Sequence, residues 1–237
     1  MPAKILSAKT SSDPDPTPAP RQRRPGRPAA KTTDADQRNR LIDAAVTLFA
    51  RHGVAATSTK AIAAEAGVTP ALVHYYFRDR DQLLDTVFDE RLQPLIEQVF
   101  GAMASHPGDI VSTLPALAGQ FIRTASATPW FPGLWIREIV STEGQLRARM
   151  LQRVALRRAS LILGPLAAAR SQGKLTPGLE PTLVMVSLIG LTLLPLATTH
   201  IWRNLPGAAD IDTETLVRHV TALLSHGLSA GDPTPDK

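Results

Sequence analysis

The chain has 237 residues, of which 43% are hydrophobic and 20% charged, a balance that excludes wholesale disorder and indicates a soluble, folded protein of one or two domains. It contains no cysteine, which excludes disulfide bonds, thiolate metal sites and a cysteine nucleophile. Its net charge of +5 favours an anionic partner such as nucleic acid or a membrane surface. The first residues lack the apolar segment of roughly 7 to 15 residues that a secretory signal needs, so we expect a cytoplasmic protein.

Residues 1–35 are predicted to be a disordered basic arm. They are rich in Pro, Ser, Thr and Arg and carry almost no large apolar groups, so they cannot offset the entropy lost on ordering. The stretch RQRRPGRPAAK, residues 21–31, concentrates positive charge just before the first helical pattern. Such a stretch is either a solvated tail or an arm that contacts an anionic partner. At the other end, residues 230–237 are predicted to be a second disordered tail.

Four helices are predicted between residues 36 and 91. Apolar side chains recur every three or four residues in a first helix that begins at Asp36 and ends at His52 and Gly53. The fourth helix begins near Asp79 and also turns its apolar side chains inward. The inward-facing positions of these two helices are Leu41, Ile42, Ala45, Leu48, Phe49, Leu83, Leu84, Val87 and Phe88.

Two short helices lie between them. The first, over residues 58–66, is capped by Ser58 and closed by Gly67, which can adopt the positive φ of a tight turn. The second has Thr69 as its N-cap and Pro70 at its first position, and it runs through the two tyrosines that follow. Two short helices joined by a glycine turn form a helix-turn-helix, whose second helix lies in the major groove of DNA. A plain helical hairpin in a bundle is the alternative.

The segment TSTKAIAAEAGVTPALVHYYFRDRDQLL, residues 57–84, resembles the N-terminal domain of the TetR family of bacterial transcription regulators. The similarity runs from about Asp36 to Phe88 and is most specific over residues 62–77. The resemblance implies an all-α fold, in which a helix-turn-helix domain over 36–91 is followed by a larger ligand-binding and dimerisation domain over 92–229.

The resemblance also implies which residues contact DNA. Side chains at the start of the recognition helix would face the base edges, and Tyr75 and Tyr76 would point toward the phosphates. Side chains at or near helix N-termini would also contact the DNA backbone. The base-facing positions offer few hydrogen-bonding groups, so we expect readout through Thr69, thymine methyl groups and DNA shape. Phe77 is expected in the core rather than at the DNA. The predicted DNA contacts of this domain are Thr59, Lys60, Thr69, Pro70, Ala71, His74, Tyr75, Tyr76 and Arg80.

The segment RPGRP, residues 24–28, resembles an AT-hook, a motif whose arginines enter a narrow minor groove. The match is imperfect because an AT-hook has Arg-Gly-Arg between prolines, whereas Pro25 precedes the glycine here. The position of this segment just before a helix-turn-helix favours an arm that contacts DNA through Arg23, Arg24 and Arg27.

The run PTLVMVSLIGLTLLPLATTHIW, residues 181–202, carries no formal charge and is long enough to raise a membrane span. Pro195 in its interior, together with Gly190 and several hydroxyl side chains, argues against that interpretation. A helix that is apolar all round must be buried on more than one face, and a second chain can supply the extra cover. We therefore expect residues 180–203 and 211–229 to form a four-helix homodimer interface, as the resemblance implies.

The resemblance places a ligand pocket within residues 95–178. Aromatic and methionine side chains suit an apolar pocket, although ordinary core packing is the alternative for each of them. Arg137 and Glu138, beside an aromatic cluster, are the candidate polar groups of such a pocket. The candidate ligand-binding residues are Trp130, Phe131, Trp135, Arg137, Met150, Met185 and His200.

Other polar patterns have simpler interpretations. His219 and His226 lie seven residues apart without a carboxylate at matching spacing, so neither a metal nor a cofactor is predicted. No nucleophile elbow, P-loop or dinucleotide fingerprint occurs, so no enzyme is predicted. A run of basic residues is expected to be the solvated face of a helix. Its members are Arg147, Arg149, Arg153, Arg157 and Arg158.

Together these observations predict a homodimeric transcription regulator, a repressor that a small-molecule ligand releases from a palindromic DNA operator. Two alternatives from other classes remain. One is a membrane-associated protein anchored by residues 181–202, and the other is an architectural protein that coats DNA without sequence preference.

Overall fold

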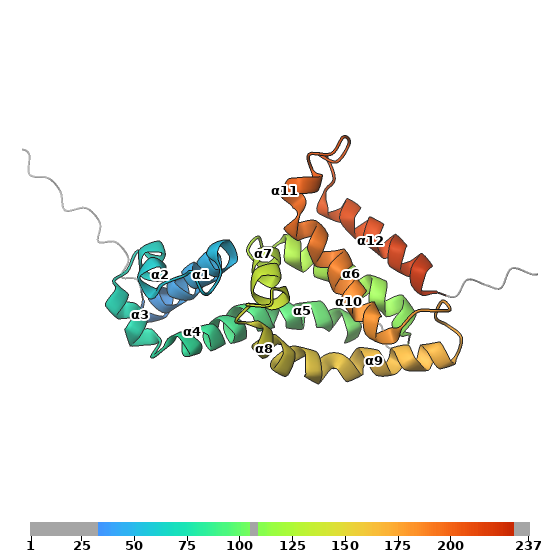
Figure 1. Ribbon diagram of the computed structural model, residues 1–237, viewed down its shortest axis with the longest axis horizontal. Helices are drawn as coiled ribbons and strands as arrows, with labels where there is room; N and C mark the ends of the chain where they lie inside the picture. Colours follow the sequence, from blue (N-terminus) through green and yellow to red (C-terminus); the bar gives the residue numbers. More distant parts are fainter. Residues whose placement is uncertain (1–32, 105–108, 230–237) are drawn as a thin grey trace, which may run out of the picture. The chain divides into compact units, whose positions relative to one another are not determined.

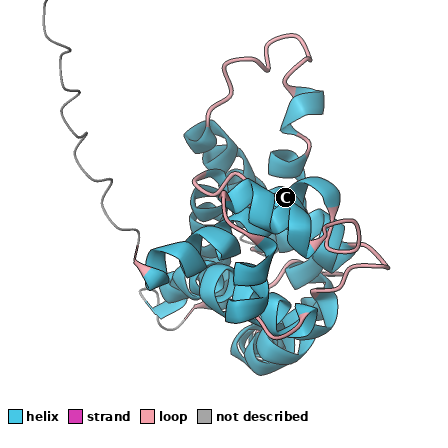
Figure 2. Cartoon of the chain, turned by 90° about the vertical axis from the view of Figure 1, so that its left-hand side faces the viewer, coloured by secondary structure: helices cyan, strands magenta, loops and turns pink. Residues whose placement is uncertain are grey.

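The structure, a computed structural model, describes residues 33–104 and 109–229. Within these ranges every regular element is a helix, and one isolated bridge pairs Leu175 with Ser229 (Figure 2). This confirms the predicted all-α class. The elements are α1 (Asp34–His52), α2 (Thr59–Ala66), α3 (Pro70–Tyr76), α4 (Arg80–Val87), η1 (Phe88–Leu92), α5 (Gln93–Ala104), α6 (Ile110–Ser126), α7 (Phe131–Trp135), η2 (Ile136–Val140), α8 (Arg147–Met150), η3 (Leu151–Ala155), α9 (Leu156–Ser171), α10 (Pro181–Ala197), α11 (Thr199–Trp202) and α12 (Thr213–Leu228), where η marks a π-helical turn (Figure 1).

Helix α1 begins two residues earlier than its apolar pattern predicts. The Thr33 hydroxyl accepts a hydrogen bond from the Asp36 backbone N–H at 3.1 Å, and the Asp36 carboxylate accepts one from the Thr33 N–H at 3.1 Å. This reciprocal capping box starts the helix at Asp34. Residues 34 and 35 are therefore helical and Thr33 caps the helix, so these three residues are not part of a disordered arm. The rest of the predicted arm, residues 1–32, lies outside the described residues.

The predicted helix-turn-helix elements are present. The Ser58 hydroxyl accepts a hydrogen bond of 3.1 Å from the Ala61 N–H and starts α2. Gly67 then adopts a left-handed conformation with φ of 67°, and Pro70 opens α3. Asp79 caps α4 by accepting a hydrogen bond of 2.8 Å from the Gln82 N–H. Side-chain caps on α2 and α4, together with Gly67 and Pro70 at the turn between α2 and α3, therefore set where these helices begin and end.

Four of the later helices, α5, α9, α10 and α12, pack against α6 (Figure 1). Helix α4, η1 and α5 follow one another without a break, so the predicted domain boundary at residues 91 and 92 falls inside a continuous helical run. The division into two domains stays a prediction.

The long apolar run of residues 181–202 is divided between α10 and the short α11. Thr198, with ψ of 15°, separates the two helices three residues after Pro195. In the described part of the chain, no helix combines the length and the hydropathy that a bilayer span requires.

Candidate nucleic-acid interface

Helix α3 is held by two helices that precede it in the chain. The Val68 N–H donates to the Ala63 carbonyl at 2.9 Å across the α2–α3 turn, and Val73 faces the core. From α1, the Arg40 guanidinium donates to the Ala66 carbonyl at 2.5 Å, which satisfies one of the free carbonyls at the end of α2. Phe77, just after α3, is 2% exposed, which confirms its expected place in the core.

The outer face of α3 is open to solvent. Thr69, Pro70, Ala71 and His74 are exposed, and Tyr75 is 74% exposed. The Thr69 hydroxyl makes no capping bond, although Thr69 is the N-cap residue. The structure thus brings these five predicted DNA contacts to one short exposed helix. Their role in DNA binding stays a prediction.

Two predicted phosphate contacts lie instead against the protein. The Tyr76 hydroxyl donates to the Asp34 carboxylate and also lies 3.0 Å from the Asp34 carbonyl oxygen. The hydrogen bond to Asp34 raises the pKa of Tyr76 to about 12. The Arg80 guanidinium donates to the Thr57 carbonyl at 2.9 Å and to the Val54 carbonyl. In this structure both side chains brace the domain.

Two predicted phosphate contacts remain at the start of α2. Lys60 is exposed there, and Thr59 is half-buried beside it. Arg23, Arg24 and Arg27 lie outside the described residues.

Glu138, in η2, joins the helix-turn-helix part to the later helices. Its side chain is 3% exposed, and Oε1 accepts a hydrogen bond of 2.7 Å from the Val54 backbone N–H. Oε2 accepts a second hydrogen bond of 3.0 Å from the Gln145 N–H. The sequence analysis predicted Glu138 as a polar group of a ligand pocket. That prediction is wrong, because both carboxylate oxygens bind backbone amides between helices.

The prediction that the basic run from Arg147 to Arg158 is a solvated helix face is also wrong for Arg149 and Arg153. Arg149 donates to Asp85 at 2.7 Å and to Asp81 at 3.2 Å. Arg153 donates to Asp85 at 2.6 Å and to Asp89 at 2.5 Å. The hydrogen bond from Arg149 lowers the pKa of Asp85. We call these five residues the interhelix clamp, because they tie α8 and η3 to α4 and η1.

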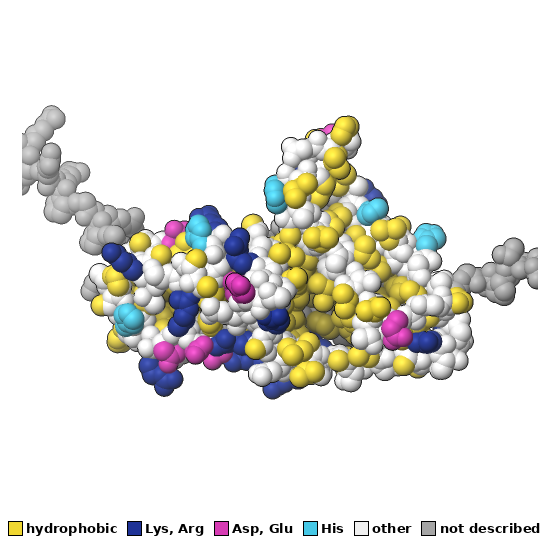
Figure 3. All heavy atoms as spheres, viewed as in Figure 1, with side chains coloured by type: hydrophobic (Ala, Val, Ile, Leu, Met, Phe, Trp, Pro, Cys, Tyr) yellow, Lys and Arg dark blue, Asp and Glu magenta, His cyan; other side chains and the backbone are white. Residues whose placement is uncertain are grey.

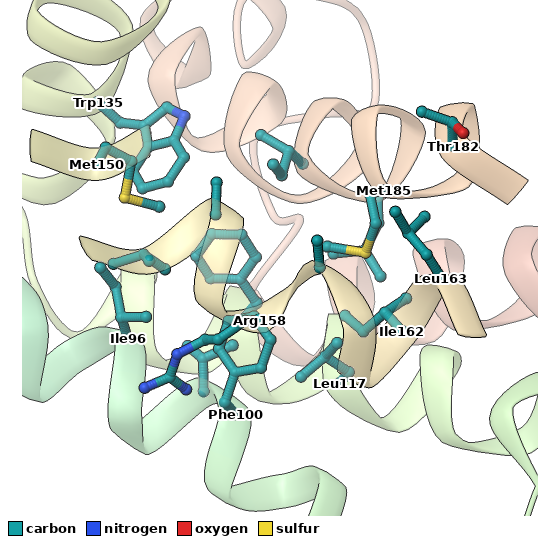
Figure 4. A pocket seen from close by; sticks show the side chains of 17 residues that line it. Ile96, Phe100, Leu117, Trp135, Met150, Arg158, Ile162, Leu163, Thr182 and Met185 are labelled. Carbon is teal, nitrogen blue, oxygen red and sulfur yellow. The ribbon is translucent and has the colours of Figure 1, made fainter. Parts of the chain in front are cut away.

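A cavity of about 260 Å³ lies among α5, α6, α7, α8, η3, α9 and α10 (Figure 4). Three predicted ligand-binding residues line it: Trp135, Met150 and Met185. The remaining lining residues are Ile96, Val99, Phe100, Leu117, Phe121, Val154, Ala155, Arg158, Ala159, Ile162, Leu163, Thr182, Leu188 and Ile189.

Four predicted ligand-binding residues do not line this cavity. Phe131 is buried in an aromatic cluster, with its ring centroid 5.6 Å from that of Trp135 and 6.0 Å from that of Trp130. Arg137 is exposed and packs near Gly53, and His200 is exposed on α11. Aromatic content alone therefore did not distinguish the cavity wall from the packed core behind it.

The sequence analysis missed most of the cavity wall. Met150, Val154 and Arg158 follow one another at intervals of four residues, which places them on one helix face that lines the cavity. The four-residue interval can be read in the sequence. Apolar residues at this spacing are equally expected in a packed core, however, so the interval alone does not identify a cavity wall. Among the described residues, no group of three or more His, Asp or Glu side chains is arranged to bind a metal ion.

Charged and apolar side chains occupy different parts of the surface. Figure 3 shows Lys, Arg, Asp and Glu gathered over the helix-turn-helix and η1, and hydrophobic side chains gathered over α10.

The described residues thus define a class of protein: an all-helical protein with an exposed helix-turn-helix and a cavity lined by later helices. Residues 41–87 match the family described as bacterial regulatory proteins, tetR family. This match assigns the helix-turn-helix segment, residues 41–87, to the TetR family.

Two curated relatives and one solved structure illustrate the similarity. The nicotine-responsive transcriptional repressor HdnoR of Paenarthrobacter nicotinovorans is 36% identical over 69 residues, which cover 29% of this chain and 36% of the relative. The transcriptional regulator AcrR of Shigella flexneri is 33% identical over 88 residues, covering 36% of this chain and 41% of the relative. The aligned segments thus span about two fifths of these relatives or less.

The likeness in fold extends further along the chain. The crystal structure of FadR from Bacillus subtilis in complex with stearoyl-CoA superposes with a TM-score of 0.60 at 19% identity, covering 80% of this chain and 98% of that chain. At this identity the likeness concerns the fold alone.

Proposed function

We propose that the protein is a sequence-specific, DNA-binding transcription regulator that acts in the cytoplasm as a homodimeric repressor. The observation that carries this proposal is the open face of α3, where Thr69, His74 and Tyr75 are exposed on a helix braced from behind by α1 and α2. A braced short helix with a free outer face can enter the major groove without reorganising the domain. Lys60, exposed at the start of α2, adds a cation beside it.

A homodimer accounts for the apolar surface of α10. Leu183, Val186 and Leu194 are 58%, 64% and 54% exposed and lie on one face of this helix, together with the small Gly190. Leu223 on α12 is 48% exposed. These side chains lie in the two segments that the sequence analysis assigns to the dimer interface. Two copies related by a twofold axis would read the two halves of a palindrome, since a single recognition helix contacts only a few base pairs.

The cavity is the proposed ligand site, and its wall reaches the helix-turn-helix through one helical run. Met150 and Val154 line the cavity, whereas Arg149 and Arg153 of the same run bind aspartates of α4 and η1. A ligand that moves this run would alter the position of α4, which follows the recognition helix in the chain. Ligand binding would then release DNA if the ligand prefers the displaced conformation.

The test is a footprint on the promoter regions next to the gene, followed by binding measurements with unrelated DNA as competitor. A specific regulator prefers its site by roughly a thousandfold or more. A preference below about tenfold would contradict the proposal and would favour the alternative, an architectural protein that coats DNA.

The arm has a separate test. Removing residues 1–31 is expected to weaken binding and to flatten its dependence on salt, since each lost phosphate contact reduces the logarithmic slope by about one. An unchanged slope would mean that Arg23, Arg24 and Arg27 do not contact phosphates.

A further inference from the structure

The cavity wall is apolar with few exceptions. Of the described side chains that line it, only Arg158 carries a charge, and Thr182 and the Trp135 indole are the other polar groups. In Figure 4, Arg158 and Thr182 lie on opposite sides of the cavity, with Met185 between them and Met150 beside Trp135. A molecule that fills this space can form its strongest polar interaction only at the Arg158 end.

Arg158 is held in place, yet most of its donors remain available. Its side chain is 20% exposed, and its guanidinium carbon lies 4.6 Å from the centre of the Phe100 ring. The structure gives the guanidinium one hydrogen bond, from Nη2 to the Glu97 carboxylate. A guanidinium has five N–H donors in a planar fork, so it can bind a second anion beside the first.

Glu97 does not block such an anion. Its side chain is 53% exposed and forms no part of the cavity wall. An ion pair at this exposure contributes little, because water solvates the carboxylate almost as well when the pair is broken. A ligand anion that enters from the cavity can therefore share Arg158 with Glu97 or replace it.

We propose that the cavity binds an anionic amphiphile, a molecule with an apolar body and a single terminal anionic group such as a carboxylate, which Arg158 binds. This inference rests on the proposed function in one respect: it takes the cavity as the ligand site. The apolar body lies against Met150, Met185 and the surrounding aliphatic side chains, and the anion lies at the rim beside Phe100. Unbranched thioether side chains adapt to the shape of the body.

The experiment compares three probes of equal chain length by calorimetry on the full chain without DNA. Decanoate, 1-decanol and decylammonium differ only in their end group, which is anionic, neutral or cationic at pH 7.5. We expect decanoate to bind at least about tenfold more tightly than either of the others, the effect of one additional charge-assisted hydrogen bond. Equal affinities, tighter binding of 1-decanol or decylammonium, or no binding of any probe would overturn the proposal.

Two variants with a matched control locate the anion. Arg158→Met keeps the apolar stem and should reduce decanoate affinity about tenfold, to that of 1-decanol. Arg157→Met removes the neighbouring arginine, which is exposed and does not line the cavity, and should leave decanoate affinity unchanged. Glu97→Gln should tighten decanoate binding. Equal losses in both arginine variants would contradict a site at Arg158, and circular dichroism establishes that each variant is folded.

Failure of this inference and failure of the proposed function give different results. Probe binding is measured without DNA, and operator binding is measured without probe. A protein that binds its operator but does not prefer decanoate would retain the proposed function and lose only the ligand class. A protein that prefers decanoate but binds all DNA equally would retain the ligand class and lose the regulatory function.

Discussion

The Glu138 carboxylate accepts a 2.7 Å hydrogen bond from the Val54 backbone N–H, although the two residues are 84 positions apart. The second carboxylate oxygen accepts from Gln145, so one buried side chain satisfies two backbone donors. Val54 lies in the loop between α1 and α2, so this contact links the base of the helix-turn-helix to the later helices.

Replacing Glu138 with Gln should destabilise the fold. An amide has one oxygen and one NH2 group, so one of the two N–H groups that now face the carboxylate would face another donor. Leaving a buried donor without an acceptor costs about 1–3 kcal/mol of unfolding free energy. Urea unfolding measures this change, with Glu143→Gln, at an exposed position, as the control. Equal stability of the two variants would argue against the buried contact.

Gly144 is required because the backbone of Glu138 lies against it. A Cβ atom at Gly144 would lie 2.2 Å from the Glu138 carbonyl oxygen, so Gly144→Ala must displace backbone. We expect a loss of about 1–3 kcal/mol, as for other overpacked sites. Gly101→Ala is the control, since nothing lies within 4 Å of its Cβ and alanine favours the interior of α5 by about 0.8–1.0 kcal/mol. Thermal unfolding should therefore shift in opposite directions for the two variants.

The interhelix clamp should weaken in acid. The hydrogen bond from Arg149 lowers the pKa of Asp85 in the folded protein, so folding favours the charged carboxylate. The resulting stability is present above the unfolded pKa of about 3.9 and is lost as the pH falls through the lower, folded value. Asp85→Asn should therefore be less stable than the wild type from pH 5 to 8, by about 1 kcal/mol or less because the side chain is 43% exposed.

The stability difference between wild type and Asp85→Asn should shrink toward zero below pH 4. Asp210→Asn, at an exposed loop position, should show no such pH dependence. Denaturant unfolding at pH 3, 5 and 7 makes the comparison, and a difference that stays constant down to pH 3 would contradict it.

Tyr75→Ala and Lys60→Ala should each weaken operator binding without unfolding the protein. Both side chains are exposed, so their removal leaves the core unchanged, while each lost DNA contact should lower affinity about tenfold. Lys174→Ala removes an exposed lysine after α9 and should bind as the wild type does. Fluorescence anisotropy with labelled operator DNA measures the three affinities, and wild-type affinity in both test variants would mean that the recognition helix has been misplaced.

Leu183→Lys should dissociate the dimer. Leu183 is 58% exposed on the apolar face of α10, and a charge there would have to be buried in the interface. Leu161→Lys on α9 is a matched control, since that leucine is 54% exposed but lies outside the predicted interface. Sedimentation velocity should show a monomer for the first variant and a dimer for the second. If both variants remained dimers, or if both became monomers, the dimer interface would lie elsewhere.

The helix-turn-helix could be predicted from the sequence because its determinants are local. Ser58, Gly67, Pro70 and Asp79 each act on backbone groups within about one turn, so their chemistry is independent of the rest of the chain. The start of α1 was predicted two residues late, because the capping box formed by Thr33 and Asp36 was not recognised.

The tertiary structure decided how the later helices are used. Arg149, Glu138 and Arg158 are plain in the sequence as charged residues, but each binds a partner that lies 61 to 84 residues away. Charge and hydropathy along a helix identify a polar face or an apolar face without identifying what covers it. What covers a given face depends on how helices distant in sequence pack together. The interhelix clamp, the buried Glu138 carboxylate and the cavity wall could therefore be identified only in the folded chain.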